Sequence, residues 1–367
     1  MIPYVLLMFF PALFSSFIVQ YRCKYIVNFD EKQRIQNNNS LLTVFFIMLI
    51  TILALRDETI GRDLRNYKHY FETISYMQFN EVLAIESDML FYLLNWIVGK
   101  YTDNYQVFLA IVAVITVLPL AVVYNDDKQH GFLKIVLFMN MSTFIMMFSG
   151  LRQSIAISMG LIAYTAVKRK KILFFLLFSS IAWGFHHSAF MILLFYPLYH
   201  VSFRKKHLWF VIPMILIVFI FNNQIFIWAT NLIDSDKYTS DINNTGAYTM
   251  LVLFIMFAIF SYVIPDERKM DKETLGLRNF LVLAVLLQCF SPLHNLAMRL
   301  NYYYIIFIPV LLPKIINYAK DDLKEAAEFS KIILIIFLVS YYMINTYNSC
   351  RTGISALDIY PYVPYWK

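Results

Sequence analysis

Apolar segments separated by short polar connections recur along the whole chain. A helix needs about 20 mainly apolar residues to cross a bilayer, and it satisfies its own backbone hydrogen bonds there. Several of these segments are shorter, and we expect them to extend into polar flanks or to lie in thinner membrane. The pattern predicts about twelve transmembrane helices, at residues 2–21, 41–55, 103–124, 132–150, 152–167, 172–185, 187–200, 208–221, 248–264, 279–292, 298–316 and 331–347. It therefore predicts an all-α, polytopic integral membrane protein with one membrane domain over residues 1–367.

Clusters of Lys and Arg fall in alternate connections between these segments. Cytoplasmic loops of membrane proteins carry an excess of both residues. We therefore place the basic clusters on the cytoplasmic side; they lie at residues 22–34, 168–171, 204–206, 268–272 and 314–331. This assignment predicts an even number of spans, with both termini on the outer, periplasmic face of the inner membrane.

Two long polar stretches then remain on the outer side. Residues 56–102 form the first periplasmic loop, and the apolar pattern within it predicts an amphipathic helix at residues 88–99. Residues 222–247, rich in Asn and Asp, form the second periplasmic loop. These loops are the places where the predicted topology leaves polar chemistry outside the membrane.

The composition agrees with a membrane protein and excludes several other classes. The chain is 60% hydrophobic and 15% charged, whereas a soluble domain carries about a quarter charged residues. The net charge of +7 is explained by the cytoplasmic loops, so we expect no nucleic-acid partner. Three scattered cysteines indicate neither a disulfide framework nor a metal motif. We expect no metal and no cofactor.

Four arginines lie at predicted outer ends of spans, away from the basic loops: Arg56, Arg62, Arg152 and Arg299. Ionisable groups near membrane depth are costly and commonly mark a functional site. A guanidinium is always charged and offers a planar fork of donors that suits phosphate. Together the arginines favour a metal-independent site for a lipid pyrophosphate. Each arginine taken alone also fits an interfacial side chain paired with a nearby carboxylate.

A histidine pair, His186 and His187, falls at a predicted outer turn between two spans. Imidazole titrates near neutral pH and is the most common general base. A histidine at a helix end is also commonly a hydrogen-bonded interface residue. We treat His186 as a candidate base on this pattern.

The first outer loop resembles a known family. Its sequence RDETIGRDLRNYKHYF is similar to the R…GxDxxxYxxxF pattern of EpsG-like polysaccharide polymerases, the Wzy type of O-antigen or exopolysaccharide repeat-unit polymerase. The matching positions are Arg56, Gly61, Asp63, Tyr67 and Phe71. Four later segments resemble the same family in the same order: ESDMLFYLLNWIV, LRQSIAISMG, FHHSAFMILL and MRLNYYYIIFIP, which place Glu86, Arg152, His186 and Arg299.

The resemblance implies a membrane glycosyltransferase of the inner membrane, active in lipopolysaccharide or other polysaccharide biosynthesis. Its substrates would be undecaprenyl-pyrophosphate-linked oligosaccharide repeats, joined at the periplasmic face among membrane lipids. A chain-length regulator is a partner that the family implies. Among the products of this class, we expect O-antigen.

The chemistry of these residues suggests a role for each in such a reaction, which we state as a hypothesis. Arg152 and Arg299 would stabilise the departing pyrophosphate, and Arg56 or Arg62 would hold the pyrophosphate of the acceptor. His186 is the first candidate for the general base, followed by Asp63 and Glu86. Gly61 and Tyr67 would shape the loop that borders the substrates.

Three other classes share some of these features. A flippase of the same lipid-linked repeats also needs many spans and cationic residues, but transporters place polar groups near the midplane, often within inverted repeats. An O-antigen ligase shares the lipid-pyrophosphate chemistry. A membrane O-acyltransferase uses a buried histidine, but with a cytoplasmic donor, on the face opposite to the predicted position of His186.

Overall fold

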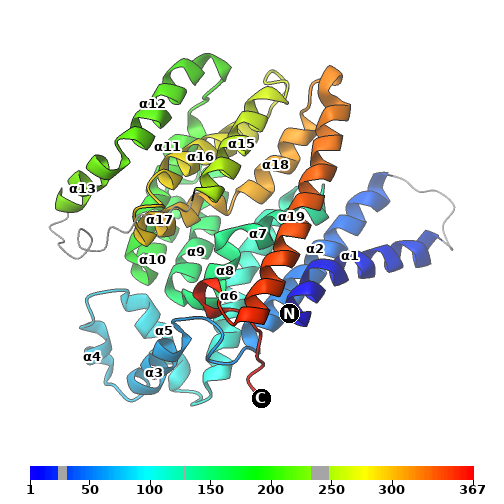
Figure 1. Cartoon of the computed structure of the whole chain (residues 1–367). Coiled ribbons are helices and arrows are strands. Elements are labelled where there is room, and N and C mark those ends of the chain that lie inside the picture. The colour runs from blue at the N-terminus through cyan, green and yellow to red at the C-terminus, as the bar shows by residue number, and fades with distance from the viewer. Residues whose placement is uncertain (24–30, 128, 233–247) are drawn as a thin grey trace. The chain divides into compact units, whose positions relative to one another are not determined.

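The computed structural model describes residues 1–23, 31–127, 129–232 and 248–367 (Figure 1). Every regular element in these residues is helical, and the β pairing among them consists of two isolated bridges. The prediction of an all-α protein is therefore confirmed for the described part of the chain. Part of the predicted second outer loop, residues 233–247, lies outside the described residues.

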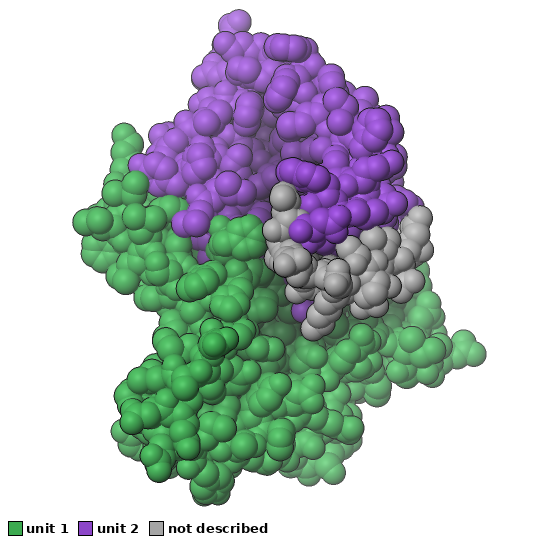
Figure 2. All heavy atoms as spheres, turned by 90° about the vertical axis from the view of Figure 1, so that its left-hand side faces the viewer, with its two compact units in different colours: residues 1–190, 331–367 green, residues 191–330 purple. Residues whose placement is uncertain are grey.

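The chain divides into two compact units, residues 1–190 with 331–367 and residues 191–330 (Figure 2), although the sequence shows no boundary within the predicted membrane domain. The first unit contains α1 (Ile2–Cys23), α2 (Glu31–Ala54), α3 (Leu64–Ile74), α4 (Phe79–Leu83), α5 (Met89–Gly99), α6 (Tyr105–Asp126), α7 (Gly131–Asn140), α8 (Ser142–Ser149), α9 (Leu151–Lys168), α10 (Ile172–Phe185), α19 (Lys324–Thr352) from Lys331 onward, and the 3₁₀ helix η4 (Ala356–Asp358).

The second unit contains α11 (Phe195–His200), η2 (Lys205–His207), α12 (Leu208–Ile220), α13 (Asn222–Leu232), α15 (Thr249–Val263), α16 (Lys272–Gln288), α17 (Asn295–Ile305), α18 (Ile308–Asn317) and η3 (Asp321–Leu323). The 3₁₀ helix η1 (His187–Leu194) joins the two sets of residues.

The twelve predicted apolar segments lie mainly in helical elements, but several are interrupted. Residues 132–150 form α7 and α8 with a bend of 64°, and residues 298–316 form α17 and α18 with a bend of 42°. The second break has a clear cause, because Pro309 has no N–H to donate to the Ile305 carbonyl and its ring would clash with that group. Residues 187–200 begin as a 3₁₀ helix instead of a span.

Length and apolar character identify two helices in the described chain that suit a membrane crossing, Tyr105–Asp126 and Asp321–Thr352. The number rises to five if each bent pair forms one span, and further apolar helices are shorter. The structure thus agrees with a membrane protein. The number of twelve spans and the side on which the termini lie stay predictions.

The core of the first unit is built around α9. This helix packs against α6 and α10, and α6 also packs against α2. Small residues of α9, among them Ala156, Ser158 and Gly160, are buried and permit close approach between helices. The Ser158 hydroxyl donates to the Thr116 carbonyl of α6 at 2.5 Å. This hydrogen bond joins the middle of α9 to α6.

In the second unit, α16 packs against α11, α15 and α17. Arg278 of α16 is fully buried, and its guanidinium forms an ion pair with Glu267 at 2.7 Å. It also donates to the Phe203 carbonyl at 2.6 Å and lies 4.0 Å from the centre of the Tyr262 ring. This arginine joins two connections and α15 at one end of the unit.

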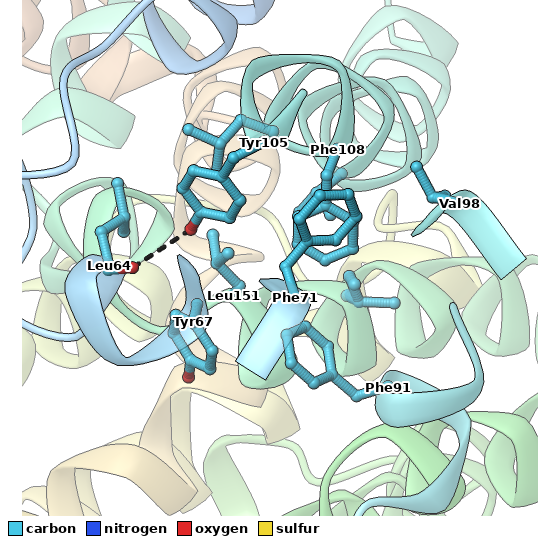
Figure 3. Close-up of a cluster of buried hydrophobic side chains, with 11 residues drawn as sticks. Leu64, Tyr67, Phe71, Phe91, Val98, Tyr105, Phe108 and Leu151 are labelled. Atoms are coloured by element: carbon cyan, nitrogen blue, oxygen red, sulfur yellow. Dashed lines mark hydrogen bonds between the residues drawn. The ribbon is translucent and has the colours of Figure 1, made fainter. Parts of the chain in front are cut away.

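The first predicted outer loop, residues 56–102, contains three helices. The predicted helix at 88–99 is confirmed as α5, whereas α3 and α4 were not predicted. Figure 3 shows Tyr67 and Phe71 of α3 packed beside Phe91 of α5 and Phe108 of α6. Leu64, Tyr67, Phe71 and Ile74 are the buried positions of α3, and their spacing is that of one helix face.

Candidate functional site

Asp88 stands directly before α5 with its backbone in the left-handed region, at φ 54° and ψ 36°. Aspartate is one of the few side chains that adopts this conformation readily. The side chain is only 5% exposed, so both carboxylate oxygens need partners from the protein. The left-handed turn points this carboxylate into unit 1 immediately before an apolar helix begins.

The partners of Asp88 come from two segments that are distant in sequence. Arg152 Nη1 donates to Asp88 Oδ2 at 2.7 Å, and His186 Nδ1 lies 3.4 Å from the same oxygen. The backbone N–H of His187 donates to Asp88 Oδ1 at 3.3 Å. One buried carboxylate therefore connects the first outer loop, the start of α9 and the turn that follows α10.

Helix ends place these side chains together. Arg152 is the second residue of α9, and His186 directly follows α10, where its N–H donates to the Ala182 carbonyl at 2.9 Å. Helices α9 and α10 pack along each other. Gly184 allows α10 to approach α5, because a Cβ at this position would lie 2.7 Å from Leu90 Cδ1. The three segments therefore converge where α5 and α9 begin and α10 ends.

Tyr67 forms an aromatic side of the cluster. The Arg152 guanidinium lies 5.7 Å from the centre of the Tyr67 ring, close enough for a cation–π contact. Tyr67 belongs to the apolar cluster of α3, α5 and α6 shown in Figure 3. Burial raises the pKa of its hydroxyl, although the positive charge of Arg152 acts in the opposite direction. Tyr67 is therefore neutral at physiological pH.

The electrostatics of the cluster centre on Asp88. Burial raises the pKa of this carboxyl, but the hydrogen bond and charge of His186 together with the charge of Arg152 lower it more. The net effect holds the pKa of Asp88 below its ordinary value, so Asp88 is ionised at neutral pH. Arg152 and His186 keep 27% and 21% of their side chains exposed, whereas Asp88 is almost fully covered. A solute can reach the cation and the imidazole while the anion stays behind them.

Asp63 and Gly61 lie on a second part of unit 1, against the end of α8. A single hydroxyl, Ser149 Oγ, donates to Asp63 Oδ2 at 3.1 Å and accepts from the Asp63 N–H at 3.3 Å. Gly61 has φ 116°, and a Cβ there would lie 2.0 Å from the Phe148 carbonyl oxygen. A glycine is therefore needed at position 61, because this positive φ is strained for other residues and the Phe148 carbonyl leaves no room for a Cβ.

The remaining predicted site residues are not hydrogen-bond or ion-pair partners of Asp88. Arg56 is 2% exposed, donates to the Leu53 carbonyl at 2.5 Å, and has its pKa lowered by burial to about 10. Arg62 is exposed and forms an ion pair with Asp358 at 3.2 Å. Glu86 is exposed, two residues before Asp88. Arg299 is exposed on α17 in the second unit.

The structure thus gathers three of the predicted residues, Arg152, His186 and Tyr67, around one that sequence reasoning missed. The segment containing Asp88 was recognised, but its resemblance to the family directed attention to Glu86. The sequence did contain a signal for Asp88, because a Ser-Asp pair immediately before an apolar helix is typical of a helix N-terminus. No group of three metal-binding side chains occurs among the described residues, and the absence of a metal from the reaction stays a prediction.

Comparison with known proteins identifies the family. The model of the EpsG family matches residues 39–365, a range that includes all of the site residues discussed above. Searches of curated proteins and of solved structures find no significant match. Because the family match covers most of the chain and the chain is rich in apolar helices, the protein belongs to the EpsG family of polysaccharide polymerase-like membrane proteins.

Proposed function

We propose that this protein is a polysaccharide polymerase that joins undecaprenyl-pyrophosphate-linked oligosaccharide repeats at the periplasmic face of the inner membrane. The observation that best supports this proposal is the cluster in which one buried carboxylate holds Arg152 and His186. The cluster lies at the start of α9, and the basic residues Lys168 and Arg169 lie at its other end, about 24 Å away along the helix axis. This separation fits a site on the face opposite to the positively charged loops.

The proposed reaction transfers the growing chain from its lipid carrier to a single lipid-linked repeat. A hydroxyl of the acceptor sugar attacks the anomeric carbon of the donor and loses its proton to a base. A new glycosidic C–O bond forms, the C–O bond to the lipid pyrophosphate breaks, and the pyrophosphate leaves with the bonding electron pair. The protein has to stabilise the charge on the leaving group and accept one proton.

Arg152 is suited to the leaving group. Its guanidinium is permanently charged and carries five N–H donors. One of its nitrogens, Nη1, donates to Asp88. An arginine oriented in advance by a carboxylate stabilises developing negative charge without further reorganisation. For Arg299, which lies in the second unit, the role of a second cation stays a prediction from the sequence. Arg62 is exposed on the loop and forms an ion pair with Asp358, whereas the burial of Arg56 favours a role beneath the loop.

His186 is the proposed general base, acting through Nε2. Its Nδ1 faces the ionised Asp88, which favours the tautomer with the proton on Nδ1 and leaves the lone pair on Nε2. The carboxylate also stabilises the imidazolium that forms when His186 takes the proton. Asp63 and Glu86 are weaker candidates, because Asp63 is engaged by Ser149 and Glu86 is exposed.

The test is the surface polysaccharide of cells that lack the gene, separated by gel electrophoresis after complementation. We expect a ladder with the wild type, a single-repeat band without the gene, and the same single-repeat band with Arg152→Ala at equal protein level. Arg65→Ala is the matched control, since Arg65 is an exposed arginine of α3 in the same loop; it should retain the ladder. Loss of the single-repeat band as well would indicate a flippase or a ligase and refute the proposal.

A further inference from the structure

The last residues of the chain, 355–367, lie against the connection that follows α2; we call them the C-terminal strap. The Asp57 N–H donates to the Val363 carbonyl at 2.9 Å, and the Tyr365 N–H donates to the Leu55 carbonyl at 3.0 Å. An isolated antiparallel bridge pairs Arg56 with Pro364 between them. The strap therefore holds the beginning of the connection through its backbone.

A second set of contacts holds the end of the same connection. The Gly61 N–H donates to the Asp358 carbonyl at 3.1 Å, and the Arg62 N–H donates to the Leu357 carbonyl at 3.0 Å. The side chains of Arg62 and Asp358 add the ion pair at 3.2 Å. Residues 55–62 are thus fixed at both ends by a segment almost three hundred positions later in the chain.

The backbone of the strap is adapted to these contacts. Leu357 and Asp358 have φ values of 57° and 55°, and two successive non-glycine residues in this region persist only where the surroundings impose the conformation. Their two carbonyls are the ones that accept from Arg62 and Gly61. The next residue, Ile359, is fully buried, and its carbonyl accepts a hydrogen bond from the Tyr4 hydroxyl.

The opposite side of the connection rests on α8. Gly61 lies against the Phe148 carbonyl, and Asp63 is held by the Ser149 hydroxyl. Helix α3 starts at the next residue and carries Tyr67 to its contact with Arg152. The strap, the connection and α3 therefore form a continuous series of contacts that ends at the Asp88 cluster.

We infer that the C-terminal strap is a positioning segment of the candidate site, and that Arg62 acts by binding Asp358 instead of substrate phosphate. The strap and α8 hold the connection from two sides, which sets where α3 begins and where Tyr67 meets Arg152. The consequence for polymerisation rests on the proposed function, whereas the contact between strap and connection does not.

Charge exchange across the ion pair tests the role of Arg62. We expect Arg62→Glu and Asp358→Arg each to reduce the fraction of long polysaccharide chains about two- to fivefold, the range that an exposed ion pair supports. The double variant Arg62→Glu/Asp358→Arg should restore most of this loss, since the pair is rebuilt with reversed signs. If Arg62 binds substrate phosphate, the double variant will be as defective as Arg62→Glu alone, and the inference is overturned.

A thiol reporter tests the strap independently of polymerisation. Ile60 lies in the connection and is 3% exposed, so a cysteine at this position should react slowly with maleimide in a full-length protein whose native cysteines are replaced by serine. Asp358→Arg should accelerate labelling of Ile60→Cys severalfold, and the double charge exchange should slow it again. Arg65→Glu, which reverses an exposed charge of α3 three residues after Arg62, should leave the rate unchanged.

The two readouts separate the possible failures. Unchanged labelling in Asp358→Arg would show that the strap does not hold the connection, which overturns the inference. The proposal that the protein is a polymerase would not be affected, because the Arg152→Ala variant tests it separately. Faster labelling with unchanged polysaccharide would show that the connection does not position the site, which overturns the inference at its second step. Loss of the single-repeat band in cells that lack the gene would instead refute the proposed function.

Discussion

The carboxylate of Asp88 is almost fully removed from water and keeps its charge because each of its oxygens has a donor. Hydrogen bonds to a charged group are worth about 1.5–3 kcal/mol each, and a buried charge without partners is strongly unfavourable. Arg152 and His186 therefore stabilise the charge of Asp88, and the Asp88 carboxylate in turn fixes their orientation. At the scale of single residues, the contacts that stabilise the buried charge are therefore the same ones that orient the candidate catalytic side chains.

Replacement of Asp88 separates this carboxylate from the one that the family resemblance favoured. Asp88→Asn keeps a side chain that tolerates the left-handed backbone but removes the charge. We expect it to lower polymerisation by about tenfold or more, because the loss of one charge-assisted bond of about 1.5–3 kcal/mol leaves Arg152 and His186 unoriented. Glu86→Gln should change polymerisation less than about twofold, as expected for an exposed side chain. The ladder on polysaccharide gels, normalised to protein level, measures both; the reverse ranking would favour Glu86.

The lowered pKa of Asp88 makes a prediction about stability and pH. The unfolded carboxyl has a pKa of about 3.9, and in the folded protein the pKa is lower because His186 and Arg152 outweigh the effect of burial. Such a group adds stability that is fully present above the unfolded pKa and is lost as the pH falls through the folded pKa. We expect Asp88→Asn to unfold at a lower temperature than the wild type from about pH 7 to about pH 5, and the difference to shrink below about pH 4. A difference that grows on acidification would contradict the assignment. Thermal unfolding in detergent measures it.

At the scale of elements, the connection between α2 and α3 depends on one glycine. An alanine at Gly61 would have both a positive φ and a Cβ 2.0 Å from the Phe148 carbonyl oxygen. Backbone strain at positive φ costs roughly 1–2 kcal/mol, and a forced shift of packed groups typically adds about 1–3 kcal/mol. The start of α3 would have to move away from α8.

Gly353 offers a matched control, since it also has a positive φ of 68° but no atom within 4 Å of the Cβ position. We expect Gly353→Ala to lower the free energy of unfolding by roughly 1–2 kcal/mol through strain alone. Gly61→Ala should lower it by at least about 1 kcal/mol more and should also abolish the polysaccharide ladder. Denaturation of the purified variants and the gel assay test the pair; equal effects would show that the contact with α8 is unimportant.

The elements show how far the sequence could be interpreted. Apolar runs predicted the helices well, down to α10 at Ile172–Phe185, because burial in an apolar environment leaves a strong linear signal. The bend between α7 and α8 and the 3₁₀ helix after His186 were missed, since the apolar pattern continues through both. Helix α3 was missed although Leu64, Tyr67 and Phe71 follow helical spacing, because the surrounding polar residues suggested a loop.

The candidate site was accessible from the sequence in part, for a related reason. Arg152 and His186 stand out as polar residues at the ends of apolar segments, so their position along the chain already marks them. Asp88 and the strap do not, because the significance of each lies in partners far away in sequence: Asp88 with Arg152, and Asp358 with Arg62. A single sequence contains no record of such pairs.

At the scale of the molecule, several distant parts of the chain share one end of unit 1. The Tyr4 hydroxyl near the N-terminus donates to the Ile359 carbonyl near the C-terminus, and the two termini lie near each other (Figure 1). The strap binds residues 55–62, which lead through α3 to the Asp88 cluster. Lys168 forms an ion pair with Asp126 at the other ends of α9 and α6. Both termini and the candidate site therefore belong to one face, and the basic connection after α9 belongs to the opposite face.

This arrangement links the topology of the protein to its proposed function. If the face that carries the termini is periplasmic, a cysteine at the exposed Thr59 should react with a membrane-impermeant maleimide in intact cells that produce an otherwise cysteine-free variant. A cysteine at the exposed Arg169 should react only after the inner membrane is permeabilised, because it lies beyond the far end of α9. The opposite labelling pattern would place the Asp88 cluster in the cytoplasm, where an enzyme that extends chains on the outer face has no substrate. Labelling of both positions in intact cells would mean that α9 does not cross the membrane. Only the first pattern is compatible with Arg152 and His186 acting on lipid-linked repeats after their export.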